Sequence, residues 1–165
     1  MATGRTAHRW LRFLLDDNGG TPREIPINSL DPVGFVYKES DASAWQDQVL
    51  GYLAEQPDAL IAVGGPLDNV AVAAVAGTGA APVLSGSHTV LNPISAPTFT
   101  TPLGLAVMFG IRGYWATGDP VFGVVAPSAT QGYSVYEYTH DGVTYKATFK
   151  PYPGSTPAWG TAILT

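Results

Sequence analysis

The stretch that decides the fold covers residues 133–150 and reads YSVYEYTHDGVTYKATFK. It contains two runs of β-branched and aromatic residues, 133–138 and 143–150, separated by a turn with the pair Asp141-Gly142. Asp-Gly favours the positive backbone φ angles of a tight hairpin turn. In the second run apolar and polar residues alternate, as in a strand with one buried face. These residues therefore predict a β-hairpin, with an apolar face made of Val143, Tyr145, Ala147 and Phe149.

The rest of the chain has a similar pattern of short apolar runs and turn residues. Fourteen prolines and nineteen glycines interrupt the 165 residues at short intervals, and the runs between them are rich in Val, Ile, Thr and aromatic residues. Short runs with turn residues between them are typical of an all-β sandwich or half-barrel, and we expect one such domain over residues 1–165. Beyond the hairpin, strands are predicted at residues 9–15, 34–39, 59–64, 102–112 and 158–164.

Two segments break this pattern. Residues 44–55 place Trp45, Val49 and Leu53 four positions apart, and this spacing predicts a short helix that flanks the sandwich. Residues 65–97 are rich in Ala, Gly, Ser and Pro without a sustained period, and this composition predicts a long loop. A short helical turn capped by Ser87 is expected within that loop, at residues 87–91.

The predicted strand at 102–112 is apolar or small on both faces. Its odd positions carry Leu103, Leu105 and Val107, and its even positions carry small residues and Met108. Such a strand is covered on both sides, by the core on one and, as we expect, by another subunit on the other.

Composition excludes several classes of protein. Charged residues make up 13% of the chain, about half the usual share, whereas hydrophobic residues reach 45%. A net charge of −5 has the wrong sign for a groove that grips a phosphate backbone. Cysteine is absent, and the apolar run after the N-terminus is cut by Arg12 and Asp16, which argues against a signal peptide. The apolar surplus predicts assembly into an oligomer, without a membrane anchor.

No catalytic or metal-binding motif stands out. The sequence has no phosphate loop and no nucleophile elbow, and His8, His88 and His140 are scattered. Ser87-His88 are adjacent, and adjacent side chains rarely face each other. We therefore expect no enzyme activity, no cofactor and no metal. The aromatic residues favour core and interface packing, and the alternative is a sugar-stacking surface around Tyr114 and Trp115.

Several stretches resemble the tail tube proteins of siphophages, in particular those of actinobacteriophages. They extend over most of the chain, at residues 15–25, 37–45, 64–69, 86–91 and 157–161. The chain differs from these relatives by an additional Ala-rich stretch at residues 70–83, an insertion that faces either the tube exterior or a neighbouring ring.

The resemblance implies a structural protein of the virion. It implies a β-sandwich or half-barrel with one flanking helix, six copies in a ring, and rings stacked into a tube through which DNA passes without specific binding. Its partners would be copies of itself and other tail proteins, namely tape measure, tail terminator and distal tail proteins. It would be made in the bacterial cytoplasm and reside in the phage tail.

For that function we expect two groups of residues to matter. Ring-to-ring contact is assigned to the 65–97 segment, in particular Asp68, Asn69 and His88. The subunit interface or core is assigned to Met108, Phe109, Ile111, Tyr145, Phe149 and Trp159. The alternatives are a capsid decoration or head-to-tail joining protein, and a carbohydrate-binding module.

Overall fold

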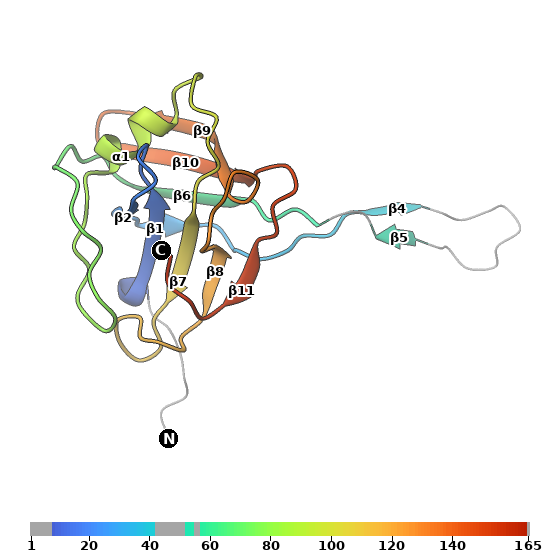
Figure 1. Cartoon of the computed structure of the whole chain (residues 1–165), viewed down its shortest axis with the longest axis horizontal. Coiled ribbons are helices and arrows are strands. Elements are labelled where there is room, and N and C mark those ends of the chain that lie inside the picture. The colour runs from blue at the N-terminus through green and yellow to red at the C-terminus, as the bar shows by residue number, and fades with distance from the viewer. Residues whose placement is uncertain (1–7, 42–51, 55–56, 165) are drawn as a thin grey trace, which may run out of the picture.

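Two antiparallel β-sheets lie face to face, and their strands run crosswise to each other (Figure 1). The computed structural model describes residues 8–41, 52–54 and 57–164. Sheet A has the order β11-β8-β7-β1-β2, sheet B the order β3-β6-β10-β9, and β4 pairs with β5. The chain is mainly β, as predicted. Its elements are η1 (His8–Trp10), β1 (Leu11–Asp16), β2 (Pro22–Glu24), β3 (Ser29–Leu30), β4 (Glu39–Asp41), β5 (Tyr52–Ala54), β6 (Ile61–Pro66), α1 (Ser87–Ile94), β7 (Leu105–Phe109), β8 (Val121–Val124), β9 (Tyr133–His140), β10 (Thr144–Pro151) and β11 (Ala158–Gly160).

The predicted hairpin forms as β9 and β10. Tyr145 lies opposite His140, and the pairing continues to the far end of both strands with one register shift at Thr148/Phe149. Gly142 has a φ of 92°, which explains why the turn needs glycine. Tyr145, Ala147 and Phe149 are buried, whereas Val143 belongs to the turn and is 73% exposed.

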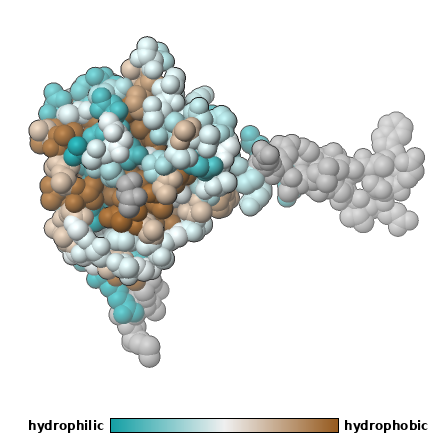
Figure 2. Space-filling view, viewed as in Figure 1, coloured by the Kyte–Doolittle hydropathy of each residue, from teal (hydrophilic) through white to brown (hydrophobic). Residues whose placement is uncertain are grey.

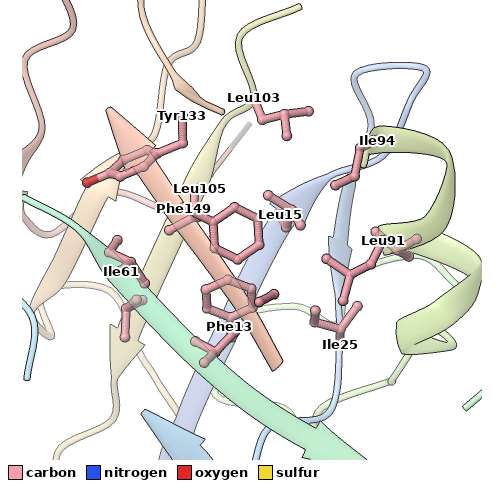
Figure 3. Close-up of a cluster of buried hydrophobic side chains, with 14 of the residues drawn as sticks. Phe13, Leu15, Ile25, Ile61, Leu91, Ile94, Leu103, Leu105, Tyr133 and Phe149 are labelled. Atoms are coloured by element: carbon pink, nitrogen blue, oxygen red, sulfur yellow. The ribbon is translucent and has the colours of Figure 1, made fainter. Parts of the chain in front are cut away.

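The main core lies between the two sheets. Phe13 and Leu15 of β1 meet Ile61 of β6 and Phe149 of β10, and the Phe13 and Phe149 rings are 5.7 Å apart (Figure 3). Helix α1 closes this core from one side, where Leu91 and two neighbours of the same helix are buried. The alternation of β1 and β10 thus determines which side chains face inward.

The prediction of a helix at 44–55 is wrong over its last turn. Residues Tyr52–Ala54 form β5, which pairs with β4. The remainder of that prediction lies outside the described residues. The β4–β5 pair extends away from the body (Figure 1), and we call it the arm. The flanking helix is α1 instead, which lies within the segment predicted as a loop.

The helix begins differently from the prediction. Its N-cap is Gly86, whose side chain cannot cap, and Ser87 is the first helical residue. The Ser87 hydroxyl donates to the Pro66 carbonyl at 2.8 Å and accepts from the Asp68 N–H at 3.0 Å. Ser87 therefore ties the helix to the end of β6.

Strand β7 is covered on both faces, but the second cover comes from the same chain. Leu105 and Val107 point into the main core, and Met108 belongs to a second cluster on the outer face of sheet A. That cluster also contains Trp115 and Leu164, with Val75 packed against it. The expectation that another subunit covers this face is therefore wrong, since residues 70–85 and the C-terminal segment cover it.

Candidate assembly interface

Strand β9 is an open edge of sheet B. It pairs with β10 on one side, and no described strand continues the sheet beyond it, apart from a bridge at Tyr133. Seven of its residues, Ser134–His140, are partly or fully exposed. Tyr136 is 65% exposed, and the Lys150 ammonium lies 3.6 Å from the centre of its ring. An unpaired edge of this length can pair with a strand from another chain.

A group of aromatic side chains lies at the β11 edge of sheet A. Trp159 of β11 is 50% exposed, and its ring lies 4.9 Å from Phe122 and 5.8 Å from Phe109. Phe35, at the base of the arm, is 40% exposed and lies 5.6 Å from Phe122. We call Phe35, Phe109, Phe122 and Trp159 the aromatic edge. Partly exposed aromatic residues are enriched at subunit interfaces.

The base of the arm adds further apolar surface. Val36 and Tyr37 are 66% and 60% exposed. The Val36 backbone exchanges two hydrogen bonds of 2.8 Å with Asp58, and these bonds hold the two chains of the arm together where it leaves the body. A groove of about 440 Å³ lies close by and includes Leu30, Val33 and Phe109 in its lining.

A third apolar surface covers the outer face of sheet A. Residues 70–85, which we call the strap, contain no charged residue. Figure 2 shows hydrophobic side chains gathered on the face where Figure 1 places the strap and the C-terminus. Its exposed large residues are Val70, Val72, Val83 and Leu84.

Buried charges hold the strap in place. The Arg12 guanidinium pairs with the Glu24 carboxylate at 2.7 Å, and both side chains are almost wholly buried. The Arg12 Nη2 also donates to the Ala76 carbonyl at 3.1 Å. Arg23 pairs with Asp17 at 2.8 Å and donates to the Ala73 carbonyl at 3.0 Å. Burial raises the pKa of Glu24, and hydrogen bonds from Arg12 oppose this rise.

The residues assigned to core or interface have three kinds of environment. Met108, Tyr145 and Phe149 are almost inaccessible to solvent. Phe109 is half-buried between the aromatic edge and the groove, and Trp159 is half-exposed. Ile111 lies beyond the end of β7, in a turn, and its N–H donates to the Asp119 carboxylate at 3.2 Å.

The residues assigned to ring-to-ring contact lie together around the start of α1. The Asp68 carbonyl accepts from the His88 N–H at 2.9 Å, and the Asp68 side chain accepts from the Val70 N–H at 2.9 Å. Thr89 donates to the Asn69 side chain at 3.4 Å and to the Val70 carbonyl at 2.9 Å. Asp68 and Asn69 therefore connect the strap to α1, and Asn69 is exposed.

Sequence reasoning missed the arm and β8. The arm was missed because Tyr52–Ala54 lie within the predicted helix. Strand β8 was missed because its four residues include Gly123 and lie between Pro120 and Pro127. The proposed sugar-stacking surface is not formed, since Trp115 is 2% exposed and its indole N–H donates to the Asp119 carbonyl at 3.1 Å. Within the described part of the chain, no group of three metal-ligating side chains is present. No described helix is long and apolar enough to cross a membrane.

Comparison with known proteins shows the fold. No protein-family model matches the chain, and no curated protein matches it in sequence. Among solved structures, it is similar to a chain of the "Cryo-EM structure of the anti-feeding prophage (AFP) baseplate, 6-fold symmetrised". The similarity covers 97% of each chain with a TM-score of 0.61 and 10% sequence identity. The two chains thus share a fold over nearly their whole lengths.

Proposed function

We propose that this protein is a structural subunit of a phage tail or phage-derived tail, without enzymatic activity, and that it forms the tail tube. Six copies make a ring, and stacked rings make a conduit that DNA crosses without specific binding. Other tail proteins, namely tape measure, tail terminator and distal tail proteins, contact the two ends of the tube. The observation that carries the proposal is the likeness over 97% of both chains to a component of a sixfold-symmetrised baseplate.

The edges of the two sheets support lateral assembly. The open edge of β9 provides backbone donors and acceptors, and the aromatic edge provides apolar area on the other sheet. Within a ring, each subunit would bring both edges against its neighbours, and the arm would reach onto an adjacent copy. Pairing between copies would also remove the exposed edge that otherwise favours uncontrolled aggregation.

The strap and the start of α1 support stacking of rings. We assign ring-to-ring contact to Asp68, Asn69 and His88 together with the exposed apolar residues of the strap. The strap has no charged residue, so little solvation of charges is lost when it is covered. The buried ion pair beneath it keeps the strap in one conformation, which lowers the entropic cost of binding.

Negative-stain electron microscopy of the purified chain over a range of concentrations tests the proposal. We expect sixfold rings and, at high concentration, stacked tubes. Trimers, or single rings that never stack, would instead favour a capsid decoration or head-to-tail joining protein. A chain that stays monomeric at millimolar concentration, with or without tail partners, would rule out self-assembly.

A matched pair of variants tests the aromatic edge. Trp159→Ala removes a half-exposed ring from this edge, whereas Tyr114→Ala removes a 40% exposed ring that lies outside it. We expect Trp159→Ala to prevent ring formation and Tyr114→Ala to leave it intact. Circular dichroism should show that both variants are folded. Equal assembly of the two variants would exclude the aromatic edge from the interface.

A further inference from the structure

Two histidines distant in sequence come together beside a tyrosine at one end of the sandwich. His88 belongs to α1 and His140 ends β9, and their ring centres are 5.4 Å apart with the rings nearly perpendicular, at 83°. Tyr138 lies 5.9 Å from the His140 ring and accepts or donates a 2.7 Å hydrogen bond at the His88 Nδ1. Tyr138 also packs against the main core, and its ring lies 6.4 Å from that of Tyr145.

The spacing suits two ligands of one metal ion. A divalent ion such as Zn²⁺ binds imidazole nitrogens at about 2.0–2.1 Å in tetrahedral geometry, which places the centres of two bound rings roughly 5 Å apart. The observed 5.4 Å is close to this value. Both histidines are at least partly exposed, so water can supply the remaining ligands.

Tyr138 supplies the second requirement of such a site. A histidine that binds a metal through Nε2 usually donates its Nδ1–H to a neighbouring oxygen, which fixes the tautomer and the orientation of the ring. The Tyr138 hydroxyl is placed to accept from the His88 Nδ1 at 2.7 Å.

The scaffold fixes the backbone of both histidines without a metal. The backbone N–H of His88 donates to the Asp68 carbonyl at 2.9 Å, and neighbouring residues of α1 are buried in the core. His140 pairs with Tyr145, a buried residue whose hydroxyl donates to the Pro26 carbonyl at 2.8 Å. A site built on a helix and a strand loses little entropy when it binds.

We propose that His88 and His140 form a binding site for a late first-row divalent ion, and that Tyr138 orients the His88 ring through its Nδ1. Within the described residues no acidic side chain completes a three-ligand set, so the site is open to water or to an outside ligand. The affinity for different ions should follow their usual order, with Cu²⁺ above Ni²⁺ and Zn²⁺. This inference holds for the single chain and does not depend on assembly.

Calorimetric titration of the full chain with Zn²⁺ tests the site. The chain has no cysteine and only three histidines, so a histidine variant reports directly on its own ring. We expect one ion per chain, a loss of more than tenfold in affinity for His88→Ala and for His140→Gln, and a loss of about tenfold for Tyr138→Phe. His8→Ala, at the third histidine, should leave the affinity unchanged.

A second measurement locates the ion independently of affinity. Paramagnetic Cu²⁺ at substoichiometric amounts should first broaden the backbone amide signals of residues 88 and 138–140 in the wild-type chain. Broadening confined to other residues, unchanged Zn²⁺ affinity in His140→Gln, or loss of binding in His8→Ala would each overturn the proposal. His140 is exposed at a strand end, so its variant is expected to melt at the wild-type temperature.

Discussion

Asp16 is a carboxylate buried at the end of β1. Its residue is 2% exposed, its Oδ2 accepts from the Gly104 N–H at 2.7 Å, and its Oδ1 has no hydrogen-bond partner in the structure. A Cβ at Gly104 would lie 2.5 Å from the Leu164 side chain and 2.7 Å from the Asp16 carboxylate, so a larger residue there would displace these side chains. The crowding of these three residues excludes water from Asp16, and this burial raises its pKa.

We expect Asp16 to make stability depend on pH. Burial, together with the nearby charge of Asp17, raises the pKa of Asp16 to about 6, against the bond from Gly104 that lowers it. Between about pH 4 and pH 6 the folded protein therefore holds a proton that the unfolded chain releases, and the free energy of unfolding falls as pH rises, by about 3 kcal/mol in total. Asp16→Asn should reduce this slope and be more stable than the wild type above pH 6, as measured by urea unfolding at a series of pH values.

Asp17 provides the control, because its pKa is shifted in the opposite direction. Burial tends to raise the pKa of Asp17, but hydrogen bonds from Arg23 and from the N–H groups of Thr21 and Gly19 outweigh it and lower the pKa. Its contribution is present at neutral pH and disappears as pH falls below the pKa of an unfolded aspartate. Asp17→Asn should therefore lose stability at pH 7. A gain in stability for Asp17→Asn, or none for Asp16→Asn, would contradict the assignment.

Phe149 tests the register of the hairpin. Its ring is wholly buried and packs against Phe13 in the main core, so Phe149→Ala should lower the free energy of unfolding by about 3 kcal/mol. Val143→Ala, in the same hairpin but 73% exposed, should change it by less than about 0.5 kcal/mol. Denaturant unfolding of both variants measures these changes. A loss below about 0.5 kcal/mol for Phe149→Ala would contradict the assignment of Phe149 to the buried face of β10.

At the scale of elements, the strap replaces a neighbouring subunit as the cover of sheet A. Its backbone is held at Ala73 and Ala76 by two arginines, and by a 2.7 Å hydrogen bond from the Ser85 N–H to the Glu24 carbonyl. These bonds compensate for the absence of regular secondary structure. An Ala-rich segment without charges can therefore remain ordered on the surface of the sheet.

Variants of the Arg12–Glu24 pair distinguish its effect on the stability of the fold from its effect on the position of the strap. Arg12→Ala leaves the Glu24 carboxylate buried without a partner and should cost about 3–5 kcal/mol. The double variant Arg12→Met/Glu24→Leu removes both charges and should recover most of this loss, because replacing a buried ion pair by apolar side chains is often close to neutral. Thermal unfolding measures both effects.

Hydrogen exchange then reports on the strap itself. The double variant still lacks the bond from Arg12 to the Ala76 carbonyl, so amides of residues 72–80 should exchange faster than in the wild type even where global stability is restored. Wild-type protection of these amides in the double variant would show that Arg12 does not anchor the strap.

At the scale of the whole molecule, the chain carries few charges, since charged residues make up 13% of it. The net charge of −5 gives no attraction for a polyanion, which is compatible with the proposed conduit for DNA. The proposed assembly would cover the exposed apolar side chains of the aromatic edge and the strap.

DNA binding tests the charge argument. We expect no change in the anisotropy of a labelled duplex at 150 mM salt up to about 100 μM protein, the weak limit of non-specific binding. A variant with lysine at the exposed positions of Asp31, Asp58 and Glu137 should bind the duplex, and salt should weaken this binding. Saturable micromolar binding by the wild type would contradict the prediction.

Local patterns were sufficient for much of the fold. The hairpin at 133–150 and the two-sided character of β7 follow from alternation and from Asp-Gly, which act over a few residues. The helix at 44–55 failed in its last turn because Tyr52–Ala54 pairs with Glu39–Asp41, and pairing between strands depends on tertiary context more than on the spacing of apolar residues. Of the candidate site, the sequence pointed to the segment around Asp68 and His88 but not to the arm or to the open edge of β9.

The sequence by itself determined the β-rich class, the apolar surplus and the absence of recognisable catalytic motifs, because composition and alternation are local properties of the chain. Only the tertiary structure decided what covers each apolar face, because that depends on segments far apart in sequence. It placed the strap on the outer face of sheet A, left β9 and Trp159 at open edges, and brought His88 beside His140.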